Sequence, residues 1–512
     1  MTAKASLPEL LGAFSVAFDQ GEKAPDETSL RAALAASRLA EVIGLPLRDA
    51  ADCYWTAMLR GLGCTGSSHE MARDFTPDER HLRHVMMDKD LGDKPDMLRR
   101  VVGAARPHGA RWVMRTIASL PAAAAGGQAK AQCDAGVVLA RGLGLPPGVV
   151  AALDDIEERW DGKGQPNAKA GQDIALAARV ACFVWIAVMA IEKGATDLGV
   201  ATVTRRRGKD LDPALVDAYV AHATDVMPTS ASVWDDAISA EPGGTTLVDE
   251  SQIDDVVTTM ARFVDLLSVY TLEHSTRVSA IAAAAAAAMG LSEDEVTATR
   301  RAGLVHDLGR IAVPAGTWEK PGPLTVTERE HVRTHAYVTE RLLARSPVLA
   351  PLARIAGADH ERLDGTGYPK GLEGDQFTKP AALLAAADVW EALLARRPHR
   401  LAFTRDAAVT LLRGEVDGGR LAHDAVEAVL AVEGVARRER VRTSGWPNGL
   451  TDREVDVLRL VAVGEPNKRI GSALGIAPKT AARHVENLYA KIGCRSRAGA
   501  ALFAVEHGLL DA

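Results

Sequence analysis

Apolar residues recur every three or four positions along most of the chain, which is the spacing of one buried face of an α-helix. Segment 256–290 shows this pattern and predicts one long helix or two, with His274 inside it. Alanine is abundant and aromatic residues make up only 4% of the chain, a composition that favours helix over sheet. The pattern therefore predicts an all-α protein.

The next helical segment, 292–311, ends in a histidine–aspartate pair. Ser292 is placed to cap this helix, with Glu295 three residues later. His306 and Asp307 come near its end. Adjacent residues on a helix point about 100° apart. The pair could therefore hold one ion only if both residues flank a cleft, or hold two ions if the carboxylate bridges them.

The apolar run 174–191 approaches the length of a membrane span. It contains Arg179 and is followed directly by Glu192 and Lys193, so we interpret it as a buried core helix. The first residues lack the apolar core and cleavage site of a secretory signal. Five cysteines without a CxxC pair suit a reducing compartment. We expect a cytoplasmic protein that does not enter a membrane.

The length of 512 residues exceeds what one hydrophobic core usually covers and predicts about three domains. The net charge of -7 would repel nucleic acid if it were spread evenly. Any binding to nucleic acid therefore requires a local basic patch.

Three segments of the first half recur in the same order in the second half. The interval is far longer than the period of a solenoid repeat, so it indicates two copies of a whole domain, 1–225 and 250–433. The matching segments are 41–64 with 287–310, 158–166 with 361–369, and 208–220 with 418–430.

The two copies differ at the positions that could carry chemistry. The first copy therefore reads as a degenerate, HD-like helical scaffold or dimerisation half, or as a ligand-sensing pseudo-enzyme, and we expect the scaffold. The pairs are His274 with Thr28, His306 and Asp307 with Arg60 and Gly61, His335 near Cys133, His360 with Glu157, and Asp388 with Trp185.

Histidines and aspartates of the second copy follow the order His, His-Asp, His, Asp-His, Asp, with the turn DGTGYP after the fourth element. A lone pair such as His423 and Asp424 we interpret as chance in a helical protein with 14 histidines. Imidazole and carboxylate ligands suit iron, manganese or zinc. Two such ions would clamp a phosphodiester and activate a water. The candidate ligands are His274, His306, Asp307, His335, Asp359, His360 and Asp388.

Residues 270–400 resemble the HD-GYP family of HD phosphohydrolases, whose name motif is matched by Gly367, Tyr368 and Pro369. The resemblance implies an all-helical domain with a centre of two or three metals that hydrolyses cyclic di-GMP. It implies that the seven candidates are ligands and that Asp307 bridges the ions. The other implied roles are catalytic for Asp307 and Arg310, and substrate-binding for Gly367, Tyr368, Pro369, Arg397 and Arg400.

Three positions depart from the family. The chain has Asp359 before His360 where the family has two histidines, and it has Arg310 where the family usually has lysine. Tyr270 replaces a frequent glutamate, which argues against a third metal. An aspartate keeps an anionic donor but changes metal preference, and arginine keeps the charge with a different reach. We expect two divalent ions, iron or manganese before zinc.

The apolar periodicity is interrupted at 434–449 by glycine, proline and a cluster of arginines, which predicts a linker. The following segment, 450–512, predicts four short amphipathic helices, the first capped by Thr451 with Glu454. Gly475 suits the turn of a helix-turn-helix. Basic residues along the helix that follows this turn would bind phosphate, although such a helix can also be a solvated face.

This segment resembles the LuxR-type helix-turn-helix over its whole length, with LTDRE, NKRI and HVENLYAKIG among the matches. The resemblance implies a homodimer on double-stranded DNA with an inverted repeat. The residues expected to face DNA are Lys479, Thr480, Arg483, His484, Asn487 and Lys491.

Three functions remain open on these residues. The chain could be a transcription regulator that hydrolyses cyclic di-GMP, a regulator that senses metal or nucleotide without turnover, or a phosphohydrolase of another nucleotide. The seven-residue ligand set supports turnover, whereas Asp359, Arg310 and the degenerate first copy support sensing.

Overall fold

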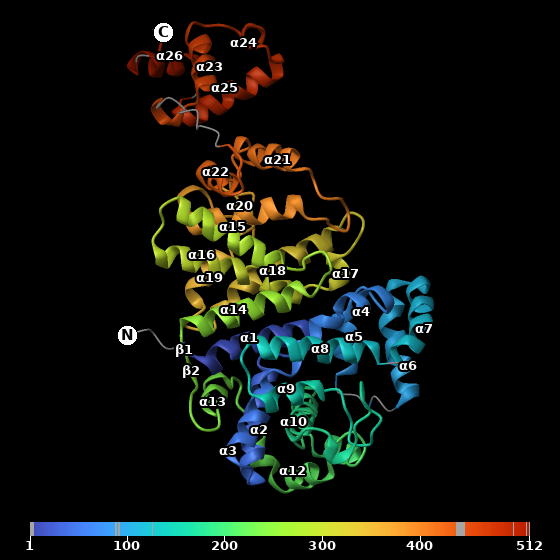
Figure 1. Ribbon diagram of the computed structural model, residues 1–512. Coiled ribbons are helices and arrows are strands. Elements are labelled where there is room, and N and C mark those ends of the chain that lie inside the picture. Colours follow the sequence, from blue (N-terminus) through green and yellow to red (C-terminus); the bar gives the residue numbers. More distant parts are fainter. Residues whose placement is uncertain are drawn as a thin grey trace. The chain divides into compact units, whose positions relative to one another are not determined.

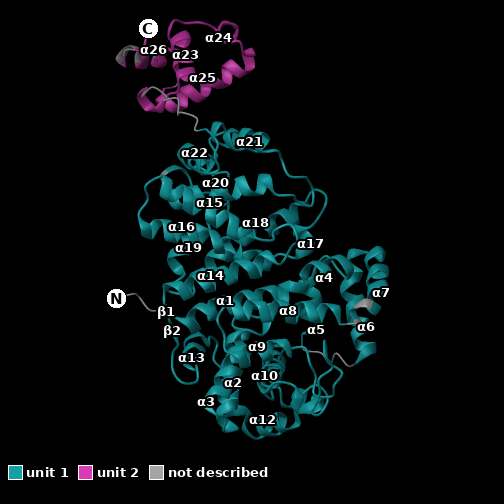
Figure 2. Ribbon diagram, in the orientation of Figure 1, with its two compact units in different colours: residues 1–437 teal, residues 438–512 magenta. Residues whose placement is uncertain are grey.

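A computed structural model describes residues 5–87, 90, 93–124, 126–436, 446–494, 496–507 and 509–510. The chain forms two compact units, Met1–Arg437 and Arg438–Ala512 (Figure 2). Helices dominate both units, so the expected all-α fold is confirmed (Figure 1). Residues 437–445 of the expected linker lie outside the described residues. No helix among the described residues is long and apolar enough to cross a membrane.

Eight helices form the body of the first copy. The apolar run 174–191 becomes α10, most of whose residues are buried in this body, as expected of a core helix. The eight are α1 (Leu7–Glu22), α2 (Thr28–Val42), α3 (Leu47–Met58), η1 (Arg60–Ser67), α8 (Gly127–Gly142), α9 (Pro147–Asp154), α10 (Leu176–Glu192) and α12 (Pro213–Val226).

The first copy contains further short helices outside this body. A group inserted between η1 and α8 has a small core of its own around Phe75, Leu82 and Val101. The group is α4 (Ser68–Asp74), α5 (Glu79–Met86), α6 (Lys94–Ala105), η2 (Arg106–His108) and α7 (Ala110–Ala124); the others are η3 (Gly171–Asp173), α11 (Val200–Arg206) and α13 (Trp234–Ser239).

The second copy repeats the body in the same order and adds a few short elements. It consists of α14 (Glu250–Asp265), α15 (His274–Ala288), α16 (Glu293–Val305), η4 (Leu308–Ala312), α17 (Ala315–Trp318), α18 (Val326–Leu343), α19 (Ala350–Ala356), η5 (Gly374–Gln376), α20 (Lys379–Leu394), α21 (Arg405–Asp417) and α22 (His423–Val432).

Of the two arrangements predicted for segment 256–290, one long helix or two, the structure has two, and His274 belongs to the second. The chain leaves the helix after Asp265 and re-enters it at His274, which is the first residue of α15. Glu273, just before it, has a left-handed backbone with φ of 61°, which ends the preceding loop. Ser292 and Glu295 form the expected capping box at the start of the next helix.

Equivalent contacts recur in the two copies. In the first, Asp19 accepts hydrogen bonds from the amide and hydroxyl of Ser29. Asp265 does the same for Ser275 in the second. These pairs tie α1 to α2 and α14 to α15, so the internal repeat seen in the sequence is a repeat of structure.

A close backbone contact that occurs in both copies identifies which residue of the first copy corresponds to His335. A Cβ at Gly309 would lie 2.0 Å from the carbonyl oxygen of His335, and a Cβ at Gly63 would lie 2.0 Å from that of Gln132. Gln132, the neighbour of Cys133, is therefore the counterpart of His335.

One hydrophobic core spans both copies, and the first copy has a second core of its own. Phe14 of α1 packs edge-on against Phe263 of α14, with ring centroids 5.1 Å apart. Helix α1 also packs against η4 and α18 (Figure 1). The short strands β1 (Ala5–Ser6) and β2 (Leu247–Val248) pair antiparallel beside them. The first copy is therefore part of the support of the second.

Unit 2 holds the four helices expected there. Thr451 and Glu454 form the predicted capping box. Gly475 ends the second helix with φ of 67°, a conformation that favours glycine, and so makes the turn before the third helix. The elements are η6 (Pro447–Gly449), α23 (Asp452–Ala462), α24 (Asn467–Leu474), α25 (Pro478–Ile492) and α26 (Arg497–Glu506).

Candidate metal centre

All seven candidate ligands converge at one place in the second copy. They come from separate segments: the start of α15, the junction of α16 with η4, the middle of α18, the loop after α19 and the middle of α20. They form two groups, and within each group the ligand atoms lie within 4.8 Å of one another. One group is His274, His306 and Asp388, and the other is Asp307, His335, Asp359 and His360.

Asp307 faces both groups. Its Oδ2 lies 3.5 Å from Nε2 of His274 and 3.7 Å from Nε2 of His306. Its Oδ1 lies 3.7 Å from Nε2 of His335 in the other group. Of the two arrangements open for the histidine–aspartate pair, this geometry matches a carboxylate between two ions.

His306 and His335 present Nε2 to the centre because Nδ1 of each is engaged elsewhere. Nδ1 of His306 lies 2.8 Å from the carbonyl oxygen of Gly303, and Nδ1 of His335 lies 2.5 Å from that of Val332. Bonds of this kind keep the proton on Nδ1 and leave the Nε2 lone pair for a metal.

Several ligand atoms have no hydrogen-bond partner among the described residues. These are Nε2 of His306, Nε2 of His335 and both carboxylate oxygens of Asp359, all buried. Buried polar atoms are nearly always paired, so a set of orphaned imidazole and carboxylate atoms is what an ion-binding centre leaves behind. The side chains present therefore fit divalent ions.

The two carboxylates of the second group have opposite pKa shifts. Burial raises the pKa of Asp359 well above its ordinary value. Burial acts in the same direction on Asp307, but the neighbouring Arg310 and His306 outweigh it, so the pKa of Asp307 is strongly lowered. An ionised Asp359 consequently needs a cation beside it, because an unpaired buried charge is costly.

Arg310 holds Asp307 in place. Its Nη1 donates to Oδ2 of Asp307 over 2.8 Å, and its guanidinium lies over the indole of Trp318 at 4.0 Å from the ring centroid. The sequence placed Arg310 here, but the role of Trp318 on α17 was not predicted. The only sign of Trp318 in the sequence was an aromatic residue eight positions after Arg310.

Glu391 is a further residue that the sequence analysis missed. Its carboxylate bonds Nδ1 of His274 and receives hydrogen bonds from Arg277. Glu391 therefore orients a candidate ligand in the way that second carboxylates orient metal-bound histidines. The signal was available in the motif, since residue 391 follows Asp388 by one helical turn.

The DGTGYP loop closes over the same centre. The ring of Tyr368 stacks on that of His360, with centroids 4.8 Å apart and planes at 22°. Glu361 accepts hydrogen bonds from the amides of Lys370 and Leu372, which holds the loop. Gly367 is packed so closely that a Cβ would lie 2.3 Å from the amide nitrogen of Arg362.

The two arginines expected to bind substrate lie in different surroundings. Arg397 is largely buried, and its Nη2 lies 3.6 Å from Glu391. Arg400 donates to the backbone carbonyls of Ala392, Leu393 and Ala395 and lies over the ring of Phe403. In this structure Arg400 braces its own loop.

The predicted DNA-facing residues lie on α25 of unit 2. Lys479, Thr480, Arg483, Asn487 and Lys491 are exposed, and His484 is half-buried. Lys491 is engaged with Glu454 at 2.8 Å. The other side of α25 packs into the small core of the unit through Ala481, Val485 and Leu488. The basic residues therefore share the solvent side of one helix.

Comparison with known proteins agrees with this architecture. Residues 259–421 match the HD domain, and residues 448–504 match the luxR family of bacterial regulatory proteins. The chain thus carries an HD domain followed by a LuxR-type helix-turn-helix domain.

Its relatives include phosphodiesterases of cyclic dinucleotides. The 3'3'-cGAMP-specific phosphodiesterase 3 of Vibrio cholerae serotype O1 is 26% identical over 418 residues, which are 79% of this chain and 90% of that protein. The cyclic di-GMP phosphodiesterase response regulator RpfG of Xanthomonas campestris pv. campestris is 41% identical over 138 residues, 27% of this chain and 36% of that protein.

A solved structure shares the fold of the two copies. The crystal structure of a cyclic GMP-AMP specific phosphodiesterase of V. cholerae, V-cGAP3, has a TM-score of 0.57 and 22% sequence identity. The match covers 85% of this chain and 99% of that one. At this identity the likeness speaks for the fold alone.

Proposed function

We propose that this chain is a transcription regulator whose HD domain, in residues 250–433, hydrolyses a cyclic dinucleotide with two divalent metal ions. The observation that carries the proposal is Asp307, whose two oxygens face separate groups of ligands. The proposed ligands are the seven residues of those groups. Iron or manganese suits their mixture of imidazole and carboxylate, and zinc is the alternative.

The ions would supply a water of lowered pKa and positive charge for the developing phosphorane oxygens. The protein's own part is positional. Asp307, anchored by Arg310, fixes the boundary between the two ligand groups. His360 is stacked against Tyr368 of the DGTGYP loop, which orients its ring. Gly367, Tyr368, Pro369 and the neighbouring Arg397 are the proposed contacts to substrate.

Cyclic di-GMP is the substrate we propose, because relatives named as cyclic di-GMP phosphodiesterases match 27 to 37% of this chain at 33 to 41% identity. The relative that spans most of this chain is named for 3'3'-cGAMP instead. Both compounds are cyclic dinucleotides that contain guanine, so both belong in the assay.

Sensing without turnover is the second candidate function. It is favoured by Asp359, which stands where the family has histidine and is fully buried. A carboxylate at this position adds negative charge to the centre, which would tighten metal binding and make the bound water less acidic. In this case the chain would bind metal or nucleotide and pass the signal to DNA.

The DNA-binding role follows from unit 2. We propose that Lys479, Thr480, Arg483, His484, Asn487 and Lys491 face double-stranded DNA and that the chain acts as a homodimer on an inverted repeat. Bacterial DNA and cyclic dinucleotides share the cytoplasm, which is the compartment we propose.

The test is elemental analysis of the purified chain together with anaerobic hydrolysis of cyclic di-GMP and 3'3'-cGAMP. The decisive variant is Asp307→Ala, and the matched control is Asp424→Ala, in the second His-Asp pair of the chain, which is exposed at 56% of its side chain. About two metals per chain and hydrolysis lost only in Asp307→Ala would support the enzyme. Metal without turnover would favour the sensor, and absence of metal in the intact chain would refute the metal-dependent enzyme.

A further inference from the structure

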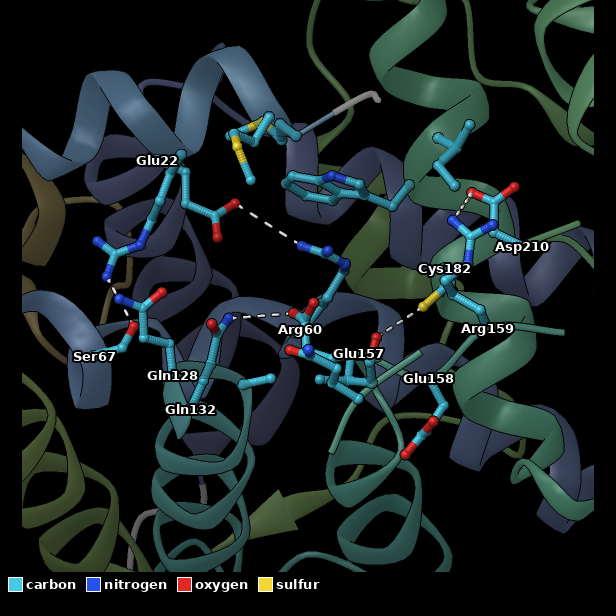
Figure 3. Close-up of a pocket in the computed structure, with 18 of the residues that line it drawn as sticks. Glu22, Arg60, Ser67, Gln128, Gln132, Glu157, Glu158, Arg159, Cys182 and Asp210 are labelled. Carbon is cyan, nitrogen blue, oxygen red and sulfur yellow. Dashed lines mark hydrogen bonds and ion pairs between the residues drawn. The ribbon is translucent and has the colours of Figure 1, made fainter. Parts of the chain in front are cut away.

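The first copy contains a cavity where the second copy has its metal centre. The cavity has a volume of about 260 Å³ (Figure 3). It is lined by Arg60, Gln132, Glu157 and Trp185, which are the counterparts of His306, His335, His360 and Asp388. The first copy therefore has, at the position of the metal centre, a cavity lined by different residues.

Arg60 brings a positive charge to the wall of this cavity. Its guanidinium lies over the indole of Trp185, 4.8 Å from the ring centroid, and its Nη1 lies 4.0 Å from Oε2 of Glu22. A distance of 4.0 Å is too long for a hydrogen bond, so Arg60 and Glu22 form an ion pair without a direct hydrogen bond. With a fixed cation inside and its imidazoles lost, the cavity is unsuited to a metal ion.

The cavity wall contains polar atoms without hydrogen-bond partners in the described part of the chain. They are Nε of Arg60, Oε2 of Glu22 and Nη1 of Arg83, all buried. The side chain of Glu22 is 6% exposed. Arg60 and Glu22, whose charged groups lie 4.0 Å apart, together suit a ligand with acceptors next to a donor.

We propose that this cavity binds the base of a guanine nucleotide. Guanine carries the acceptors O6 and N7 next to the N1–H donor, so Arg60 would donate to the acceptors while Glu22 accepts from N1–H. Met71, Met86 and Ile186 add apolar wall against the base. Adenine presents an amino donor in place of O6 and would set a donor against Arg60.

The volume limits the ligand. Sites for drug-sized molecules measure roughly 300–1,000 Å³. At about 260 Å³ the cavity suits a base with part of its sugar rather than a whole cyclic dinucleotide. A mononucleotide such as GMP is therefore the probe of choice.

The walls of the cavity continue into the supports of the metal centre. Glu22 ends α1, and its neighbour Gly21 lies so close to Ile311 of η4 that a Cβ there would be 2.6 Å away. Arg83 lies on α5, the helix from which Glu79 bonds the amide of Ala315 over 3.0 Å. A ligand bound in the cavity of the first copy can thus affect the position of η4, which follows Asp307. This effect on the metal centre rests on the proposed function.

The test is calorimetric titration of the full chain with GMP and with AMP. We expect GMP binding that survives Asp307→Asn at the metal centre and weakens at least about tenfold in Arg60→Gln. AMP should bind at least about tenfold more weakly than GMP. Because Arg60→Gln could fail to fold, its thermal unfolding is recorded, and Glu22→Met provides a second variant with the same expected loss.

Three results would overturn the proposal. They are GMP binding lost in Asp307→Asn but kept in Arg60→Gln and Glu22→Met, equal binding of GMP and AMP, and no binding of GMP to the intact chain. Hydrolysis of cyclic di-GMP and of 3'3'-cGAMP is measured on the same samples. GMP binding that depends on Arg60 in a chain that hydrolyses neither compound would refute the proposed hydrolysis and leave this site standing.

Discussion

Arg310 donates from Nη1 to Oδ2 of Asp307 over 2.8 Å, which ties the side chain between the two ligand groups to a fixed cation. The indole of Trp318 holds that cation from its other side. The carboxylate that faces both groups is therefore held by side chains of the chain itself.

Loss of this support should weaken the centre. We expect Arg310→Met to lower metal affinity or turnover by about 10- to 100-fold, the usual effect of removing a partner of a metal ligand. Arg310→Lys keeps the charge but loses the flat stack on Trp318, so it should lie between wild type and Arg310→Met. Metal content and hydrolysis rates are measured for both variants. Wild-type values in Arg310→Met would contradict the supporting role of Arg310.

Glu391 should matter for metal binding although it is not a candidate ligand. Glu391→Ala frees Nδ1 of His274, and we expect metal affinity to fall by about 10- to 100-fold. Glu391→Gln can still accept a hydrogen bond and should lose less. Competition with a chelator measures the order; equal metal affinity in both variants and wild type would show that Glu391 only packs.

Glu79 should make stability depend on pH. Burial raises its pKa from 4.5 to about 7, although Arg83 acts against this rise. The folded chain therefore keeps a proton that the unfolded chain releases near pH 4.5. The free energy of unfolding should fall by up to about 3 kcal/mol as the pH rises from 4.5 to 7.

The variant Glu79→Gln removes this titration. Urea unfolding at pH 5 and pH 8 should show a smaller decline in the variant, while the exposed Glu41→Gln should behave like wild type. An unchanged decline in Glu79→Gln would assign the pH dependence to other groups.

Gly309 should not tolerate a side chain. A Cβ there would lie 2.0 Å from the carbonyl oxygen of His335 and 2.6 Å from the amide nitrogen of Thr339. We expect Gly309→Ala to lower the stability by about 1–3 kcal/mol or more, the cost of overpacking. Gly103→Ala, where a Cβ meets nothing within 4 Å in helix α6, should be neutral or slightly stabilising. Denaturant midpoints compare the two.

Arg483 should contribute to DNA binding through charge. It is exposed on α25. If it contacts phosphate, Arg483→Ala should weaken binding and reduce the slope of log affinity against log salt concentration by about 1. Arg99→Ala, on an exposed side chain of unit 1, is the control. Titrations of a LuxR-type operator at several salt concentrations would show the difference, and identical slopes would exclude a phosphate contact.

The chemistry of the second copy could be predicted because its residues carry local signatures. His306 and Asp307 are adjacent, and Gly367, Tyr368 and Pro369 form a contiguous motif, so their order was readable without any fold. Helix caps such as Ser292 with Glu295 were readable for the same reason, since both partners lie within one turn.

Residues that act across the fold could not be predicted in this way. Trp318 reaches Arg310 by a cation–π contact, and Glu391 reaches His274 across 117 positions of sequence. The sequence left open whether segment 256–290 forms one helix or two, because apolar periodicity continues through the turn that ends at Glu273. Hydrophobic spacing reports which face is buried and is nearly blind to a change of direction between two helices.

By itself, the sequence determined the all-α class, the duplication, the set of seven convergent residues and the helix-turn-helix, because each depends on residue identity and short spacing. Only the tertiary structure decided that Asp307 faces two ligand groups, that Arg400 braces its own loop and that Arg60 and Trp185 border a cavity. Those facts depend on which side chains approach one another after packing. That outcome is set by the free energy of the whole core rather than by any local segment.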